Sequence, residues 1–481
     1  MSIVSLESKD EKNISMSIAQ FFAVYGIISL LRNCGGLKLK GVPVRELFTY
    51  TVTNAFRMGS FYMQQKVGTI REEFSKNTYY RFLANPRINW LRFTTLLSER
   101  IINSHIRPLT SEKRDDCFVI DDSLYERTGF KRTEYASRVF DHVSKRYMKG
   151  FRLLTLGWTD GCTFMPINSS LLASNKEENI LGTRSKIDKR TISGQRRLMA
   201  CQKATDVMIY LLKTALGAGH QAKYVLFDSW FSNPKQILDV KELGLNVIAM
   251  VKRSSKRNYI FEGKRMNIKK IFASCKKRRG RSKYLLSVPV KVGQDKTGKN
   301  GIDARIVCVR NRNKHKDWIA IICTDMGLSE QDIIRIYGHR WDIEVFFKTC
   351  KSSLLLGNEY HGLSYDGLTA HVAIVFTRYM LLAVSKRNNE DDRTLGELFY
   401  LMVSEVADIT YHESMMIIVE AMLATVQEEF HITDEQIECF YSKFMSKLPE
   451  SMQRLLQANC EIYLLKYTVF KEPLGFSVWE V

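Results

Sequence analysis

The sequence predicts a mixed α/β core that is interrupted by a β-rich segment and flanked by helical regions. Short apolar runs alternate with amphipathic stretches between residues 116 and 250, which is typical of a mixed sheet covered by helices. Strand-like runs joined by Lys- and Gly-rich turns fill residues 253–324, and apolar residues recur at helical spacing in 14–110 and after 365. With 481 residues, 45% of them hydrophobic, the chain is long enough for two or three domains with buried cores.

The first part, residues 1–110, is predicted to be helical. Three amphipathic stretches carry this prediction: SIAQFFAVYGIISLLRN, PVRELFTYTVTNAFRMGSFYM and RFLANPRINWLRFTTLLSERIINSHIRP. Basic and aromatic side chains mix in the last stretch, around Arg87 and Trp90. This mixture fits a DNA-binding helical region, and it equally fits a solvated face over an ordinary core.

Two predicted strands of the α/β core end in carboxylates. DCFVIDDS ends with Asp121 and Asp122, and AKYVLFDSWFS carries Asp228 after its apolar run. FRLLTLGWTDG and TFMPINSSLL are predicted as two further strands, and the Asn-Pro pair at 233–234 is predicted to open a helix. Strand alternation sends neighbouring side chains to opposite faces, so only one of Asp121 and Asp122 is expected to be a principal ligand.

One long helix is predicted from about residue 329 to 355. Tyr337, Arg340, Glu344 and Lys351 follow one another at offsets of 3, 4 and 7, which places them on one face, and Lys348 joins that face. A carboxylate among these cations fits a site where metal and DNA phosphates meet. The alternative is an ordinary salt-bridge ladder on a solvated helix.

Three carboxylates that meet at one edge can hold two divalent cations about 3.5–4 Å apart. Hard oxygen ligands favour Mg²⁺ or Mn²⁺. The sequence therefore predicts a site for two such ions, although acidic residues at strand ends are common in proteins of other kinds.

The charge of the chain is uneven. The net charge is +21, and residues 251–316 hold 22 Lys or Arg against 3 Asp or Glu, which favours a polyanionic partner. Residues 401–481 hold 5 basic and 13 acidic residues, so we expect dimer contacts rather than DNA contacts there. The cysteines lack metal spacing, the first residues do not resemble a signal peptide, and no apolar run is expected to span a bilayer; these features predict a soluble intracellular protein.

The spacing Y-x2-R-x3-E-x6-K resembles the YREK signature of bacterial DDE transposases of the insertion sequence 4 family. IDDS and VLFDSWFS resemble the first-strand and second-strand motifs of this family, and the first favours Asp122 over Asp121 as the metal ligand. Trp318, in DWIAIICTD, resembles the tryptophan that stacks on an unstacked base. Lys252 and Arg253, in VKRSSK, resemble a basic loop that grips transposon ends.

The resemblance implies an RNase H-like catalytic domain over residues 111–360, with the β-rich insertion at about 253–324. It implies that Asp122, Asp228 and Glu344 hold two Mg²⁺ (or Mn²⁺) ions for cut-and-paste transposition of double-stranded DNA through a hairpin. Terminal inverted repeats and target DNA would be the substrates, and residues 361–481 would support a homodimer in the synaptic complex, in the bacterial cytoplasm at the nucleoid. The DNA-contacting residues would be Tyr337, Arg340, Lys348, Lys351, Trp318, Lys252 and Arg253.

Two other functions remain open from the sequence. One is a catalytically silent DNA-binding protein derived from a transposase, which the three intact carboxylates disfavour. The other is a nuclease without joining activity, which the basic insertion and the complete YREK spacing disfavour.

Overall fold

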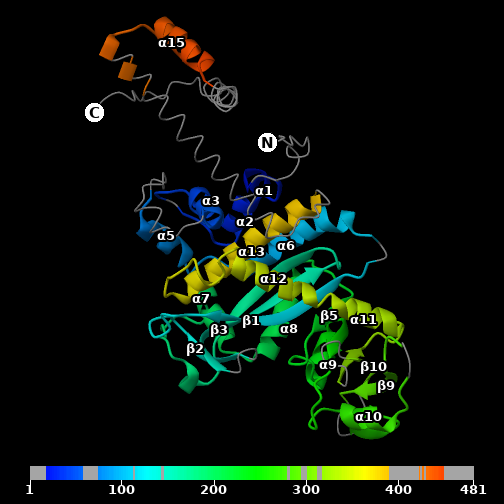
Figure 1. Cartoon of the computed structure of the whole chain (residues 1–481). Coiled ribbons are helices and arrows are strands. Elements are labelled where there is room, and N and C mark those ends of the chain that lie inside the picture. The colour runs from blue at the N-terminus through cyan, green and yellow to red at the C-terminus, as the bar shows by residue number, and fades with distance from the viewer. Residues whose placement is uncertain are drawn as a thin grey trace. The chain divides into compact units, whose positions relative to one another are not determined.

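The computed structural model describes most of the chain and divides it into two compact units, Met1–Phe399 and Tyr400–Val481 (Figure 1). The described residues are 18–38, 40–57, 74–111, 114–141, 146–278, 282–293, 301–310, 317–388, 422, 425–426 and 429–448.

The centre of the first unit is a mixed sheet built around β1 (Cys117–Glu126). β1 pairs antiparallel with β3 (Arg146–Thr159) on one side and parallel with β5 (Tyr224–Phe227) on the other. β4 (Phe164–Leu172) continues the sheet beyond β3, and β6 (Asn246–Met250) runs parallel to β5. All four residues of β5 are buried, as expected for a central parallel strand that is covered on both faces.

The same sheet continues past β6 through the segment predicted to be β-rich. β11 (Trp318–Cys323) pairs antiparallel with β6, and β10 (Ile302–Arg310) and β9 (Leu286–Val292) follow it. The sequence predicted these three strands. It missed the hairpin β7 (Asn258–Phe261) and β8 (Lys264–Asn267) at the end of the sheet, because the hairpin strands have only four residues each. Two other elements were also missed, β2 (Ser137–Asp141) and α10 (Ile268–Ser274).

Three helices connect the strands of the core. The sequence predicted one helix up to about residue 216, but the structure has α7 (Ile192–Ala200) and α8 (Ala204–Gly217), separated by a three-residue turn. α9 (Pro234–Glu242) begins where the Asn-Pro pair predicted it. The side chain of Asn233 accepts a hydrogen bond from the Gln236 amide, which is an N-cap interaction, and proline suits the first helical position.

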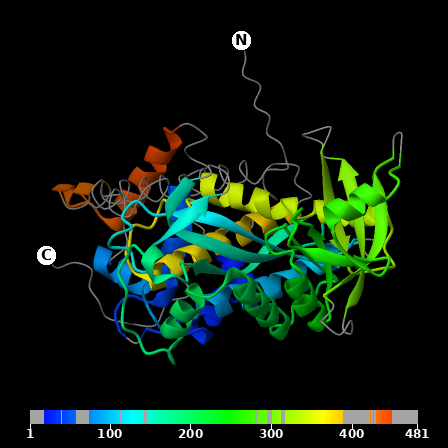
Figure 2. The same cartoon turned by 90° about the horizontal axis from the view of Figure 1, so that it is seen from below.

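The N-terminal part is helical, as predicted, and packs around a long helix from later in the chain, α13 (Tyr365–Asn388). α13 lies against α3, α5, α6 and β4 (Figures 1 and 2). Trp90 belongs to this core, being only 1% exposed, whereas Arg87 is exposed. The elements before β1 are α1 (Ile18–Val24), α2 (Ile27–Asn33), α3 (Val44–Thr53), η2 (Asn54–Arg57), α5 (Lys76–Leu83), α6 (Trp90–Ile101), η3 (Ile102–Ile106) and η4 (Arg107–Leu109).

The length and composition of α13 would allow it to cross a bilayer, which the sequence interpretation did not expect. However, 94% of its most apolar 18-residue window is buried inside the protein. A helix that is apolar all round and enclosed by other helices is typical of a protein core.

The position of α13 also changes the expected domain boundaries. The sequence suggested divisions after residues 110 and 360, but the compact first unit runs to Phe399. The reason is burial: Arg378 of α13 is fully buried and pairs with Glu359, and its guanidinium also donates to the carbonyls of Thr51 and Val52 in α3. Segments from the beginning and the end of the first unit therefore share one core.

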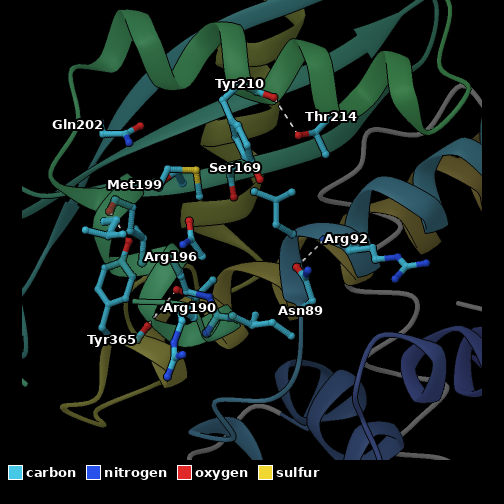
Figure 3. Close-up of a pocket in the computed structure, with 17 residues that line it drawn as sticks. Asn89, Arg92, Ser169, Arg190, Arg196, Met199, Gln202, Tyr210, Thr214 and Tyr365 are labelled. Carbon is cyan, nitrogen blue, oxygen red and sulfur yellow. Dashed lines mark hydrogen bonds between the residues drawn. The ribbon is translucent and has the colours of Figure 1, made fainter. Parts of the chain in front are cut away.

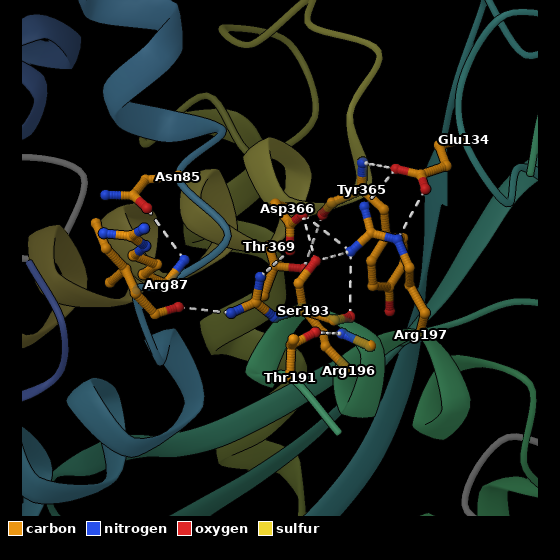
Figure 4. Close-up of polar contacts among 12 residues, drawn as sticks. Asn85, Arg87, Glu134, Thr191, Ser193, Arg196, Arg197, Tyr365, Asp366 and Thr369 are labelled. Carbon is orange, nitrogen blue, oxygen red and sulfur yellow. Dashed lines mark hydrogen bonds and ion pairs between the residues drawn. The ribbon is translucent and has the colours of Figure 1, made fainter. Parts of the chain in front are cut away.

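A second buried ionic cluster joins α7, α13 and the loop before β2 (Figure 4). Arg197 pairs with Glu134 at 2.6 Å and with Asp366 at 2.9 Å. Arg196 also pairs with Asp366 and donates to the carbonyl of Ile88. Every charged group in this cluster has a partner, which is the condition for burying charge without a large loss of stability.

In the second unit the described part includes α15 (Asp434–Ser446), which agrees with the predicted helical character. Thr433 caps this helix, and Gln436 completes a capping box. Most of the segment 361–481 that was predicted to support dimerisation lies outside the described residues.

Candidate active site

The carboxylates of the first two predicted motifs lie at neighbouring positions of the sheet. Ile120 on β1 is aligned with Phe227 on β5, so the next residues, Asp121 and Asp228, leave the paired region side by side. The Asp228 carboxylate accepts a hydrogen bond from the amide of Trp230 at 2.8 Å. The predicted strand end is wrong for β1, which continues along β3 to Glu126, but the pairing of β1 with β5 ends at Ile120 and Phe227, so acidic residues of both strands follow at that point.

Arg340 connects Asp121 to Glu344. Its guanidinium donates to the Asp121 carboxylate at 3.3 Å and to the Glu344 carboxylate one helical turn away. The predicted single helix is in fact two helices, α11 (Glu330–Gly338) and α12 (Trp341–Ser352), which meet at His339 and Arg340. The backbone of His339 and Arg340 stays helical or nearly helical between the two helices. Arg340 and Glu344 therefore keep the predicted contact.

Asp122 has a different partner. Its carboxylate receives two hydrogen bonds from Arg152 of β3, through Nε and Nη2. Leu124 is aligned with Arg152 across the ladder, and alternation places Asp122 on the same face as Leu124. The Asp122 side chain is 7% exposed and that of Arg152 is 26% exposed, so this is a largely buried ion pair. Asp121 and Asp122 are consecutive on β1, but the first contacts Arg340 and the second contacts Arg152.

Burial and mutual repulsion make it unfavourable for the neighbouring carboxylates at this edge to be charged at the same time. Burial, with the Asp122 charge and a smaller contribution from Asp228, raises the pKa of Asp121 to about 7, and Arg340 opposes this shift. Burial also raises the pKa of Asp228, and Asp122 adds to the increase. An added cation would stabilise the charged forms of these carboxylates.

The donor chemistry of the edge fits a hard divalent cation. Asp121, Asp228 and Glu344 offer carboxylate oxygens, and the buried Tyr337 hydroxyl lies near Asp228 and Arg340. Within the described part of the chain, however, no group of three Asp, Glu, His or Cys side chains is gathered closely enough to hold a metal ion. Arg340 lies between Asp121 and Glu344, which accounts for their separation.

The other residues of the predicted helical face differ in exposure. Tyr337 is buried, and burial raises the pKa of its hydroxyl. Lys348 is exposed, one turn beyond Glu344, whereas burial lowers the pKa of Lys351 and Asp141 opposes that shift. Trp341, the first residue of α12, is 61% exposed.

Trp318 and the predicted basic loop lie together. The Trp318 ring stacks on Phe272, with centroids 4.1 Å apart and 13° between the planes, and Arg253 lies over it at 5.2 Å. Arg253 also pairs with Asp317. Lys252 instead lies over the ring of Trp230 at 5.6 Å. The ring of Trp318 is thus already in contact with side chains of its own chain.

Two features of this region were missed from the sequence. Arg152 had no assigned role, although it holds Asp122, and Trp230 had none, although its amide binds Asp228 and its side chain is 46% exposed. The sequence signal for Trp230 was its place two residues after the second acidic residue. No local signal identifies Arg152, because its contact depends on the β1–β3 register.

The cavities among the described residues of the first unit include two of similar size. One, of about 460 Å³, is lined by residues of α6, β4, α7, α8 and α13, including Arg92, Arg196 and Tyr210 (Figure 3), and contains none of the predicted site residues. The other, of about 520 Å³, includes Arg152 and Trp230 and so adjoins the carboxylate edge.

Comparison with known families gives two matches. A model described as DDE superfamily endonuclease matches residues 63–287, which include Asp121 and Asp228. A model described as transposase DDE domain matches residues 202–381, which include Asp228 and Glu344. No curated protein sequence matches the chain. The chain is thus similar to DDE endonuclease and transposase domains over these two segments, and its mixed sheet brings acidic residues of the matched segments together.

Proposed function

We propose that the chain is a cut-and-paste transposase of the insertion sequence 4 family, acting on the terminal inverted repeats of its element and on target DNA. The observation that carries this proposal is the link from Asp121 through Arg340 to Glu344. It brings a carboxylate of the sheet, a guanidinium and a carboxylate of α12 into one site, which suits a DNA phosphate next to a divalent cation.

The chain topology supports an RNase H-like core with an insertion. The two acidic strands β1 and β5 are adjacent and parallel in the centre of the sheet. The strands β7 to β11 lie between Asp228 and Glu344 in the chain and extend the sheet from β6. The strongly basic 251–316 segment falls in this extension, as expected of a DNA-contacting insertion.

We propose Asp121, rather than Asp122, as the first-strand ligand. Asp121 is level with Asp228 and contacts Arg340, whereas Asp122 is held by Arg152. Asp122 then acts through charge and position, because it fixes Arg152 and raises the pKa of Asp121. This choice reverses the preference that the first-strand motif gave.

Two Mg²⁺ or Mn²⁺ ions held by Asp121, Asp228 and Glu344 would supply activation of the attacking oxygen and charge neutralisation at the leaving oxygen. The protein's own groups would position the DNA: Arg340 would turn toward a phosphate, and Lys348 would contact the backbone from the exposed face of α12. Water would nick the element's end, and the freed 3′-hydroxyl would attack the opposite strand to give a hairpin. Hydrolysis of the hairpin and attack on target DNA would complete the reaction by in-line displacements.

Several parts of the proposal rest on the family resemblance. They are synapsis by a homodimer through the C-terminal region, action at the bacterial nucleoid, and DNA contacts by Lys252, Arg253, Tyr337 and Lys351. Base stacking by Trp318 would require a base to displace Phe272 or Arg253 from its ring.

Cleavage of DNA that carries the inverted repeats flanking the gene, with Mg²⁺, tests the proposal. We expect Asp121→Asn, Asp228→Asn and Glu344→Gln each to lower the cleavage rate roughly 1,000-fold or more. Asp122→Asn should lower it less than about tenfold, and Asp188→Asn, an exposed ion-pair residue, is the control. Wild-type cleavage by all three variants would refute the site. Loss with Asp122→Asn but not with Asp121→Asn would restore Asp122 as the ligand.

A further inference from the structure

The cavity next to the carboxylate edge has an unusual lining. It is formed by β2, the middle of β3, the segment after β4, the α7–α8 turn with the start of α8, and the loops after β5 and before β7. Four of its lining residues are basic and none is acidic; they are Arg138, Arg152, Lys203 and Arg257. A concave surface with charge of one sign attracts an anion of opposite sign.

The four cations fall into two groups. Arg152 is held by Asp122, and Arg257 donates to the backbone carbonyls of Ser229 and Ser232, so both are committed to the wall of the cavity. Arg138 and Lys203 are exposed, and neither forms an ion pair with the residues that the structure describes. They are therefore available to a phosphate.

An aromatic surface faces the same cavity. Trp230 lines it and keeps 46% of its surface exposed, and its loop is held in place by Arg257. Trp230 follows the proposed metal ligand Asp228 by two residues, and its backbone amide donates a hydrogen bond to the Asp228 carboxylate. Lys252 lies over the Trp230 ring at 5.6 Å, so a nucleobase, which can stack on tryptophan whatever the DNA sequence, would use the other face or displace the lysine.

The size of the cavity selects a single nucleotide. Its volume of about 520 Å³ is within the range of roughly 300–1,000 Å³ that is typical of small-molecule sites. It is too small to receive a duplex. A base that is still paired and stacked has both faces covered by its neighbours, so only an unpaired base can present a face to Trp230.

We infer that this cavity binds one unpaired nucleotide of the DNA substrate, with the base on Trp230 and its phosphate on Arg138 and Lys203. The inference rests on the proposed function, because it takes the DNA at the carboxylate edge as given. The inferred site lies on the face of β1 to which Asp122 points. The contact between Arg340 and Asp121 is on the opposite face. Its effect is to hold a distorted DNA strand beside the carboxylates.

The test compares three probes: a labelled duplex with one unpaired thymidine, the same duplex with an abasic residue at that place, and the fully paired duplex. Binding is measured by fluorescence anisotropy with full-length protein in Ca²⁺, without turnover. The wild-type protein should bind the unpaired base roughly 5- to 150-fold more tightly than the abasic probe. Trp230→Ala should abolish this difference, and Trp230→Phe should keep most of it.

Two matched variants complete the design. Tyr210→Ala, which changes an exposed aromatic residue of α8 outside this cavity, should keep the preference for the unpaired base. Arg138→Gln combined with Lys203→Gln should weaken binding of the unpaired-base and abasic probes by the same factor. Near-ultraviolet circular dichroism shows that each variant is folded.

The inference fails if the wild-type protein does not prefer the base over the abasic residue, or if Trp230→Ala keeps the preference. It also fails if Trp230→Ala weakens both of these probes equally, since that would indicate a phosphate contact alone. Failure of the proposed function looks different: Asp121→Asn and Asp228→Asn would then cleave like wild type, whatever the binding assay shows.

Discussion

Arg340 donates a hydrogen bond to Asp121 across 219 positions of sequence. This contact fixes the start of α12 against the middle of β1, so the helix that carries Glu344 is positioned by the sheet rather than by its neighbours in the chain. Arg340 lies where α11 and α12 meet, and from this position its guanidinium contacts both carboxylates.

Lys348→Gln should weaken DNA binding without changing sequence preference. Lys348 is exposed one turn beyond Glu344, so its ammonium can displace a counterion from a phosphate. We expect the slope of log K against log salt concentration to fall in magnitude by about 1. Lys213→Gln, an exposed lysine on α8, serves as the control. An unchanged slope for Lys348→Gln would show that α12 does not contact the DNA backbone.

Arg378→Met should strongly destabilise the first unit. The Arg378 side chain is fully buried and pairs with Glu359 at 2.6 Å, so the substitution leaves a buried carboxylate without its cation. The expected loss in the free energy of unfolding is about 3–5 kcal/mol, measured by urea denaturation. Arg190→Gln removes an ion pair whose arginine is 91% exposed, and should leave the urea denaturation curve unchanged. Equal effects of the two substitutions would contradict this account.

His371 should make stability depend on pH. Burial lowers its pKa to about 4, with Glu359 opposing the shift, and its Nε2 accepts a hydrogen bond from the Gly357 amide. Between pH 6.5 and 4 the unfolded chain binds a proton that the folded protein excludes, so stability falls as the pH falls. Relative to His371→Gln, the wild-type protein should lose roughly 3 kcal/mol over this interval. A constant difference between the two unfolding curves from pH 7 to 4 would refute the prediction.

Truncation after Phe399 should separate synapsis from catalysis. Phe399 ends the first compact unit, which contains every predicted catalytic residue, so the shortened protein should fold and nick DNA. It should not form paired-end complexes in native gels, because the acidic C-terminal region is proposed to hold the dimer. Paired ends at the wild-type level would place the dimer contact in the first unit instead.

The sequence predicted the strands of the core well, because their apolar runs are long and bounded by turns. It could not decide between Asp121 and Asp122, since alternation gives two phases and only the pairing of Ile120 with Phe227 selects one. The role of Arg152 could not be predicted from the sequence, because it depends on the register between β1 and β3.

Helical periodicity had a different limit. It correctly placed Arg340 and Glu344 in contact, since residues four apart meet on any helix. It did not reveal the break at His339, although Gly338, the last residue of α11, is of a type that is common near helix ends.

The burial of α13 bears on how the chain folds during synthesis. α6 ends at Ile101 and packs on α13, which begins at Tyr365, so 264 further residues must be translated before this packing partner exists. At roughly 5–20 residues per second this takes about 13–50 s. Until α13 is synthesised, apolar side chains of α6 such as Phe93 and Leu97 lack this packing partner and stay exposed. During this interval the nascent chain would most need a chaperone.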